Sequence, residues 1–240
     1  MMSEQPGNAT PGTVASNGVK VVELTAFHVL IPLRKPFRHA SHTRSSTDNI
    51  VVRCVLDDGT EGFGEGVPRE YVTGETIEGS FEVLCRTDWA GQLEPCRDFA
   101  QATALAERLR LAPVAGDERG CMAHAARCAV ELSLLDAWGR RFGESLSSVT
   151  RLLAPDLWQP RSRVRYSGAI SSAQGLKLHL KSLLLRWYRF RHVKVKVGIA
   201  GLDDVSRLRV IRRYLNPRQV ALRIDANEAW SAEDVVQRCR

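Results

Sequence analysis

Short apolar runs with strand-like alternation come first in the chain. They predict strands over residues 19–32, 49–56 and 61–67, where Val, Ile and Leu are concentrated. Residues 34–47, between the first two runs, are basic and polar, so we expect a loop there. The sequence DDGT at 57–60 is typical of the turn in a β-hairpin. The three strands therefore predict an antiparallel meander.

Helical periodicity follows the strands. Apolar residues recur every three or four positions over residues 75–85, 97–111 and 122–142, which predicts three helices. Residues 69–74 are expected to form a loop, with Thr73 capping the first helix. In the third helix the apolar face is continuous, which indicates a buried core helix. That face carries Ala126, Val130, Leu134 and Trp138.

Residues 161–240 show a different order, in which strands alternate with helices. We expect strands over residues 164–170, 192–198 and 220–227. We expect helices over residues 173–188 and 202–214 and from residue 232 onward. This alternation predicts a parallel sheet with crossover helices. The Pro-bearing segment 152–160 lies between the two patterns, so we expect two domains, residues 19–151 and 161–240.

The composition is that of an ordinary globular protein, with 44% hydrophobic and 25% charged residues in a chain of 240. No apolar run is long enough to cross a bilayer, so we expect no membrane partner. Residues 1–18 are polar and lack the apolar middle of a signal peptide, and we expect a disordered tail there. A cytoplasmic location is the expectation that follows.

The six cysteines contain no CxxC pair and are expected to be reduced and buried. Cys121, His124 and Cys128 would share one face of a helix, which could suggest a metal site. The helix around them is rich in alanine and no fourth ligand lies nearby in the sequence. Core packing is therefore the preferred interpretation.

Charge is distributed unevenly along the chain, whose net charge is +7. Residues 1–160 hold 16 Lys and Arg against 21 Asp and Glu, whereas residues 161–240 hold 18 against 6. A basic half of this kind can mark a nucleic-acid-binding region, or a domain whose acidic complement lies elsewhere.

The basic segment at 177–192, KLHLKSLLLRWYRFRH, could bind nucleic acid through bases stacked on Trp187, Tyr188 and Phe190. The alternative is a helix whose leucines pack against the strands while its basic residues are solvated. We prefer the helix because leucines recur at helical spacing, and we do not expect nucleic acid as a partner. The leucines expected to be packed are Leu176, Leu180, Leu183 and Leu184.

Alternate glycines, Gly62, Gly64 and Gly66, occupy the third predicted strand. They lie in a hairpin, and no Lys-Ser/Thr pair follows them, so they do not match a nucleotide-binding loop. We expect them instead to allow close packing of the backbone against another element.

Polar residues gather near the ends of two predicted parallel strands. Lys194 and Lys196 alternate with valines and point to one face, and Asp225 and Asn227 do the same on the next strand. Parallel strands bring their carboxyl ends to one edge of a sheet, where α/β folds place their chemistry. The two ammonium groups would be roughly 7 Å apart, so each disfavours protonation of the other. A solvated edge strand is the alternative reading of the same lysines.

Five motifs in this order resemble a known family. They are PFRHASHTR, DGTEGFGEG, AVELSLLDAWGRRFG, KVKVG and RIDANEAW. The chain resembles the enolase superfamily, in its mandelate racemase and muconate lactonizing enzyme branch, from about residue 19 to residue 240. The resemblance implies an α+β capping domain, an antiparallel β-meander plus helices, followed by the first three β/α units of a TIM-type (β/α) barrel.

The resemblance also implies an activity and its cofactor. Members abstract a proton alpha to a carboxylate, as racemases, epimerases or cycloisomerases, and Mg²⁺ or Mn²⁺ stabilises the enolate. A dehydratase of the o-succinylbenzoate synthase type is the alternative within the superfamily. From another class, a non-catalytic basic nucleic-acid-binding or interaction protein is the rival. The implied partner is a small carboxylate substrate, and complete members are expected to form homo-oligomers.

The same resemblance assigns roles to individual residues. Lys196 would be the acid/base and Lys194 would tune it, while Asp225 would be the first metal ligand and Asn227 would line the site. From the capping domain, Arg44 could clamp a substrate carboxylate in a bidentate fork, although a solvated loop arginine is an equal reading. Tyr71 is a further candidate for substrate binding.

A closed barrel needs eight β/α units, and the chain provides three. By resemblance, the two other carboxylate ligands and a second lysine would lie in the units that are missing. We therefore expect the chain to be truncated, and the chain by itself to be catalytically inactive. A lone carboxylate binds Mg²⁺ poorly, because that ion prefers several oxygen ligands.

Overall fold

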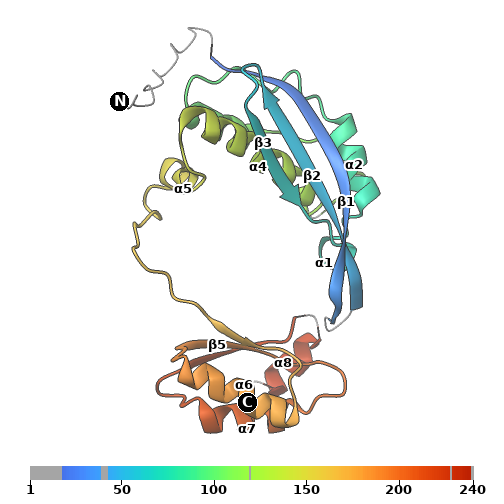
Figure 1. Ribbon diagram of the computed structural model, residues 1–240. Coiled ribbons are helices and arrows are strands. Elements are labelled where there is room, and N and C mark those ends of the chain that lie inside the picture. Colours follow the sequence, from blue (N-terminus) through green and yellow to red (C-terminus); the bar gives the residue numbers. More distant parts are fainter. Residues whose placement is uncertain (1–17, 39–42, 119, 228, 239–240) are drawn as a thin grey trace, which may run out of the picture. The chain divides into compact units, whose positions relative to one another are not determined.

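The computed structural model divides into two compact units, each with its own buried core (Figure 1). One unit contains residues 1–32 and 46–159, and the other contains residues 33–45 and 160–240. The structure describes residues 18–38, 43–118, 120–227 and 229–238. The tail predicted over residues 1–18 lies outside the described residues, except for Gly18. Within the described residues, no helix combines the length and apolarity needed to cross a membrane.

The first unit is built on the sheet β1-β2-β3. Its strands are β1 (Val21–Arg38), β2 (Thr43–Leu56) and β3 (Glu61–Gly66). Strands β2 and β3 pair in antiparallel register, with Val52 opposite Gly64. The predicted three-stranded meander is confirmed, but the loop predicted over residues 34–47 is wrong, because both strands extend into it. Charged side chains on alternate, exposed positions do not prevent an extended backbone.

Helices α1 to α5 follow the sheet in sequence. They are α1 (Glu70–Thr73), α2 (Ile77–Arg86), α3 (Phe99–Arg108), α4 (His124–Phe142) and α5 (Ser148–Leu153). The loop predicted over residues 69–74 contains α1. Thr76, not Thr73, caps α2, and its hydroxyl accepts a hydrogen bond of 3.0 Å from the Gly79 N–H. The Thr73 hydroxyl instead donates to the Glu75 carboxylate.

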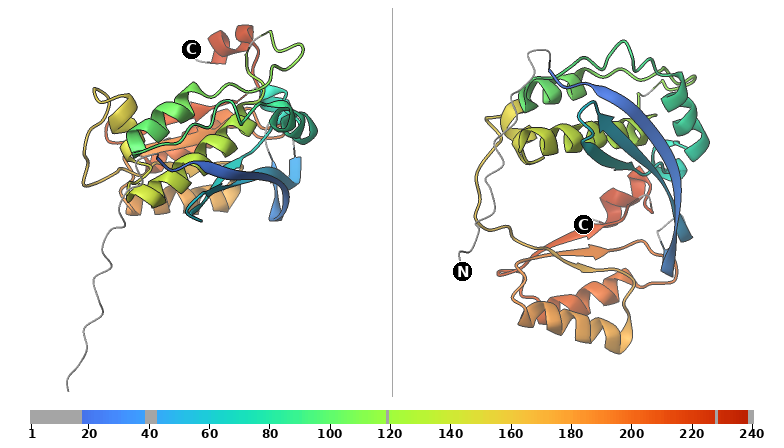
Figure 2. Two further views of the ribbon diagram at one scale, coloured as in Figure 1. Left: turned by 90° about the horizontal axis from the view of Figure 1, so that it is seen from above. Right: turned by 45° about the horizontal axis from the view of Figure 1, so that its top comes forward.

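Helix α4 lies directly against β3 (Figure 2). The alternate glycines of β3 place no side chain between the two elements. A Cβ atom added to Gly62 would lie 2.2 Å from the Ala137 nitrogen, and one added to Gly64 would lie 2.1 Å from the Ala129 carbonyl oxygen. Both distances are far inside van der Waals contact. The expectation that these glycines allow close backbone packing is confirmed.

The same helix also protects the outer edge of the sheet. Strand β3 is an edge strand, and an unpaired edge is open to pairing with another chain. The Asp136 carboxylate on α4 accepts a hydrogen bond of 3.0 Å from the Phe63 N–H of β3. The helix therefore packs on the strand and satisfies one of its outward-facing donors.

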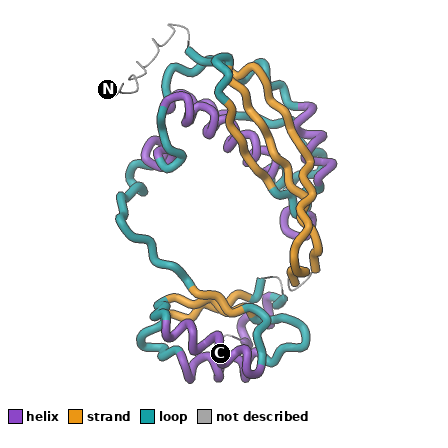
Figure 3. Tube along the Cα trace, viewed as in Figure 1, coloured by secondary structure: helices purple, strands orange, loops and turns teal. Residues whose placement is uncertain are grey.

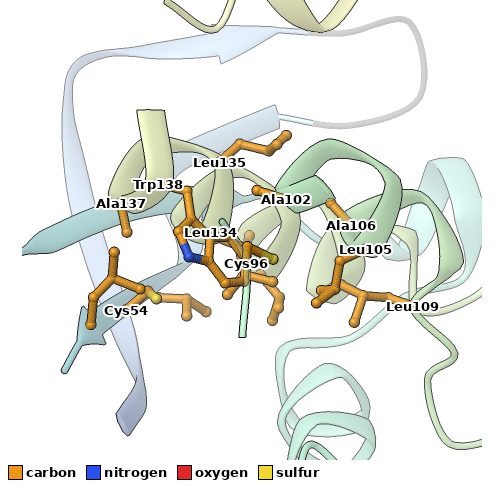
Figure 4. Close-up of a cluster of buried hydrophobic side chains, with 14 of the residues drawn as sticks. Cys54, Cys96, Ala102, Leu105, Ala106, Leu109, Leu134, Leu135, Ala137 and Trp138 are labelled. Carbon is orange, nitrogen blue, oxygen red and sulfur yellow. The ribbon is translucent and has the colours of Figure 1, made fainter. Parts of the chain in front are cut away.

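The core of the first unit lies between the sheet and helices α3 and α4 (Figure 4). All four residues of the predicted α4 core face are buried, and Trp138 and Leu134 are fully so. Burial raises the pKa of the Cys54 thiol to about 12, so it acts as an apolar group. The described cysteines are free, as expected, but Cys85 and Cys128 are exposed and that expectation of burial is wrong.

The second unit is built on the parallel sheet β4-β5-β6. Its strands are β4 (Gly168–Ile170), β5 (His192–Lys196) and β6 (Ala221–Asp225). Its helices are α6 (Gly175–Trp187), α7 (Asp204–Tyr214) and α8 (Ala232–Arg238). Helices α6 and α7 cover one face of the sheet (Figure 3). The predicted partial barrel of three β/α units is confirmed.

The buried face of α6 differs from the one predicted. Leu178, Ser182 and Leu185 are buried against the sheet. The leucines expected in that position are all exposed, by 48% to 75%: Leu176, Leu180, Leu183 and Leu184. Leucine occurs on nearly every side of this helix, so helical spacing alone predicts the helix and not the face that it buries.

Replacing Gly64 by alanine is expected to destabilise the first unit by about 3 kcal/mol or more, because the new methyl group would meet backbone atoms of α4 that cannot move independently. Urea unfolding followed by circular dichroism measures the effect.

Gly59→Ala serves as the control for this substitution. Gly59 has a φ of +83° but no atom within 4 Å of an added Cβ, so only backbone strain of about 1–2 kcal/mol is expected. Equal losses for the two variants would contradict the close approach of β3 and α4.

Candidate active site

Lysines and valines alternate along β5. Val193 and Val195 are buried on the helix-covered face, while Lys194 and Lys196 are half-buried and point to the opposite face. The shared direction predicted for the two lysines is therefore observed. In the parallel register, Lys196 lies opposite Asp225, so the second lysine and the carboxylate meet at the carboxyl edge of the sheet.

Asp225 forms an ion pair with the first lysine. Its Oδ2 lies 2.9 Å from Lys194 Nζ, and the side chains are 22% and 33% exposed. The hydrogen bond from the Lys194 ammonium is the main cause that holds the pKa of Asp225 below its ordinary value. Burial opposes this effect, and the charges of both lysines support it. Asp225 is therefore a carboxylate in neutral solution.

Strand β6 ends at Asp225 and does not reach Asn227, contrary to the predicted strand over residues 220–227. Asn227 has a φ of 51°, in the left-handed region that asparagine tolerates. Its backbone N–H donates a hydrogen bond of 3.1 Å to Asp225 Oδ1. The predicted position of Asn227 on the same face as Asp225 relied on strand alternation. Because the strand ends before Asn227, alternation does not apply to this residue, and its side chain is exposed.

Arg207 on α7 is a buried residue that the sequence analysis did not identify. Its guanidinium donates to the carbonyl oxygens of Ser171, Ala173 (3.3 Å) and Lys196 (3.0 Å). It also forms an ion pair of 2.8 Å with Asp204. One cation thus holds together the segment after β4, the end of β5 and the start of α7. The sequence does not predict this role for Arg207, because arginine is rarely buried.

The loop after β5 is fixed by two further contacts. Asp204 Oδ2 accepts a hydrogen bond of 2.6 Å from the Gly198 N–H. Gly198 has a φ of +73°, and a Cβ atom there would lie 2.5 Å from the Ala229 side chain and 3.0 Å from Trp230 Nε1. Only glycine satisfies both the conformation and the space, so the segments that follow β5 and β6 can pack closely.

A hollow of about 470 Å³ lies beside Lys196. Its lining includes Ser171 and Ser172 after β4 and residues 199–202 after β5. A volume of this size accommodates a small organic molecule. Lys196 therefore borders a space at the edge of the sheet where α/β folds bind substrates.

Asp225 does not by itself form a site for Mg²⁺. One of its oxygens contacts Lys194 and the other accepts the Asn227 N–H. Among the described residues, no group of three or more His, Cys, Asp and Glu side chains could hold a metal ion. Because Mg²⁺ requires several oxygen ligands, the described residues supply at most one of them.

Arg44 and Tyr71, predicted to bind substrate, lie far from β5 in the sequence. Arg44 is half-buried near the start of β2, and Tyr71 is half-buried in α1. Arg44 belongs to the second compact unit and Tyr71 to the first. Their roles remain predictions.

Two matches to known families show the class of protein to which this fold belongs. Residues 21–150 match the N-terminal domain of the mandelate racemase / muconate lactonizing enzyme family, and residues 179–240 match the enolase C-terminal domain-like family. The chain belongs to the mandelate racemase and muconate lactonizing enzyme branch of the enolase superfamily.

The chain is similar to particular members of this family. The chain is 26% identical to an L-Ala-D/L-Glu epimerase of Clostridium acetobutylicum, over 90% of this chain and 56% of that protein. A mandelate racemase/muconate lactonizing protein from Herpetosiphon aurantiacus superimposes with a TM-score of 0.64 at 25% identity, covering 96% of this chain and 57% of that one. The chain thus spans little more than half the length of these relatives.

A third relative was crystallised with ligands. The dipeptide epimerase from Methylococcus capsulatus, complexed with Mg and the dipeptide L-Arg-D-Lys, has a TM-score of 0.58 and 25% identity. The match covers 92% of this chain and 58% of that one.

Replacing Lys194 by methionine is expected to raise the pKa of Asp225 toward its ordinary value, because the main hydrogen bond to the carboxylate is lost. Carboxyl carbon NMR across an acid titration measures the shift. The ion pair stabilises the fold, by up to about 1 kcal/mol for partly exposed groups, only while Asp225 is ionised. The stability difference between the two proteins should therefore be present at neutral pH and vanish below the lowered pKa. Lys181→Met, which changes an exposed lysine of α6, is the matched control and should leave the pKa of Asp225 unchanged. An unchanged pKa of Asp225 in the Lys194→Met variant would contradict the ion pair.

Arg207→Met is expected to destabilise the second unit by about 3 kcal/mol, because Asp204 would lose its buried partner and several carbonyl groups their donor. Arg209→Met changes an exposed arginine on the same helix and is expected to stay within about 0.5 kcal/mol. Urea unfolding measures both. Similar stabilities for the two variants would show that the buried guanidinium is dispensable.

Proposed function

We propose that a complete protein containing this chain is a metal-dependent racemase or epimerase, which abstracts a proton alpha to a carboxylate. The observation that carries this proposal is the arrangement at the sheet edge. Lys196 borders a hollow and lies opposite Asp225, and Lys194 completes the group on the same face. Family membership and the epimerase relatives support the reaction class.

Lys196 is the proposed acid/base. As the base, Lys196 would take the α-proton of a substrate held in the hollow that it borders, and Lys194 on the same face would help to neutralise the charge that develops. Lys194 is paired with Asp225, so its charge is held in place beside Lys196, which borders the hollow. The roles follow from these positions and from the family resemblance.

A dipeptide or an N-acylated amino acid is the proposed substrate class. The epimerase relatives carry dipeptides in their names or crystal complexes. Such a substrate has a carboxylate next to the carbon that loses its proton, and its enolate needs a nearby cation. Mg²⁺ supplies that charge when bound. Asp225 would provide one of its ligands.

The 240-residue chain alone is proposed to be inactive. Its described residues supply a single carboxylate at the site, whereas Mg²⁺ binding needs several oxygen ligands. The remaining ligands and the second acid/base would come from further β/α units of a complete barrel.

Exchange of the substrate α-proton in D₂O, followed by NMR with a panel of L,L-dipeptides and Mg²⁺, tests the proposal. A full-length protein that contains this chain is expected to exchange the proton, and Lys196→Met to slow exchange by about 10²-fold or more. Lys181→Met, on α6, is expected to leave the rate unchanged.

Two results would contradict these statements. Exchange of the α-proton by the 240-residue chain alone would show that this chain is sufficient for catalysis. Full exchange activity in the Lys196→Met variant would show that another group is the base.

A further inference from the structure

The amino-terminal edge of the sheet β4-β5-β6, opposite the candidate active site, carries a concentrated positive charge. A hollow of about 1020 Å³ is formed there by the turn between α6 and β5 and the turn between α7 and β6. Among the described residues, six arginines line it and no carboxylate does. The arginines are Arg186, Arg189, Arg191, Arg212, Arg213 and Arg218. This set is called the arginine edge below.

The charges of the arginine edge are not neutralised within the described part of the chain. All six side chains are exposed, and none forms an ion pair with a described carboxylate. The described acidic residues of the second unit lie elsewhere, after the carboxyl end of β5, at the end of β6 and on α8. Like charges gathered in this way repel one another, so an anionic ligand would stabilise the edge.

Helix dipoles account for only part of this arrangement. Arg186 lies in the last turn of α6, and Arg212 and Arg213 lie in the last turn of α7, where cations are favourable. Arg189, Arg191 and Arg218 lie in the loops outside the helices. Half of the six arginines therefore lie in loops, and the helix dipoles do not explain their positions.

Aromatic rings stand among the arginines. Phe190 and Tyr214 line the hollow and are half-buried. Trp187 and Tyr188, next to Arg186 and Arg189 in the sequence, are 72% and 66% exposed, with ring centroids 5.2 Å apart. Trp187 directly follows Arg186 and Tyr188 directly precedes Arg189 in the chain, outside the lining of the hollow. Exposed rings in such positions offer flat surfaces on which bases stack while the guanidinium groups contact phosphates.

We propose that the arginine edge binds single-stranded nucleic acid. Phosphates of the strand would occupy the hollow, where guanidinium groups bind them in bidentate fashion, and bases would stack on Trp187 and Tyr188. The open, fully exposed arrangement fits an extended polyanion better than a single small anion. An acidic peptide would use the charges but has no requirement for the exposed rings.

This proposal departs from the expectation that nucleic acid is not a partner. Leucines at helical spacing favour a helix over residues 177–192, and that helix is observed as α6. The four leucines expected to pack on the strands are exposed, however. The two readings are also compatible, because the arginines lie at the end of the helix and beyond it.

The test is fluorescence anisotropy of a labelled 20-nucleotide oligothymidylate with the full 240-residue chain at graded KCl concentrations. Binding is expected at low salt and should weaken as salt rises. The variant Arg191→Glu/Arg218→Glu is expected to bind at least about tenfold more weakly. Its salt slope should fall by about 1.4, since each lost phosphate contact contributes about 0.7 on single strands.

The matched control is Arg97→Glu/Arg110→Glu, which makes the same change in net charge on exposed residues of the first unit. It is expected to bind within about twofold of the unchanged chain. Equal weakening by both double variants would overturn the proposal, because attraction would then depend on net charge alone. Circular dichroism checks that each variant is folded.

A further arm separates nucleic acid from other anions. Trp187→Ala/Tyr188→Ala is expected to weaken binding of the oligonucleotide without weakening binding of inorganic polyphosphate, which has no bases. Unchanged binding of the oligonucleotide would overturn the stacking contribution and with it the choice of nucleic acid. Binding to phosphatidylserine vesicles without any binding to the oligonucleotide would assign the edge to a membrane surface and overturn the proposal.

Discussion

The parallel pairing of β5 with β6 is the constraint on which the candidate site depends. The register of this pairing places Lys196 opposite Asp225. A shift of β5 by one residue would move both lysines to the face that the helices cover. Buried Val193 and Val195 oppose such a shift, because they would then face away from the core. The hydrophobic residues of one face thereby fix the charged residues of the other. Arg207 then ties the loops that follow the strands to this fixed edge.

Much of the fold could be predicted from the sequence because it depends on periodicity. The order of strands and helices, the core face of α4 and the role of the β3 glycines all follow from patterns of two or nearly four residues. Element ends were less predictable. Strands β1 and β2 extend into a segment that reads as a loop, since its charged residues tolerate an extended, exposed backbone.

The positions of the candidate site residues could be predicted where strand alternation determines them, and not elsewhere. The common face of Lys194 and Lys196 follows from strand geometry, whereas the turn at Asn227 depends on local backbone conformation. The burial of Arg207 could not be predicted from the sequence, because it depends on carbonyl groups from distant segments. The arginine edge likewise arises from two turns that only the sheet brings together. Sequence reading recovers local patterns and misses contacts made by separated segments.

The glycine face of β3 has a consequence for how the first unit forms. Gly62, Gly64 and Gly66 offer no side chain to a growing core, and flexible glycines make the unfolded chain harder to order. Strand β3 pairs with β2 across a short turn, but its glycine face is covered only when α4 docks, and the hydrogen bond from Phe63 to Asp136 joins residues 73 positions apart. Contacts this distant in sequence close slowly. Strand and helix are therefore expected to become ordered in one late, cooperative step, with β3 amides gaining protection from hydrogen exchange as α4 docks.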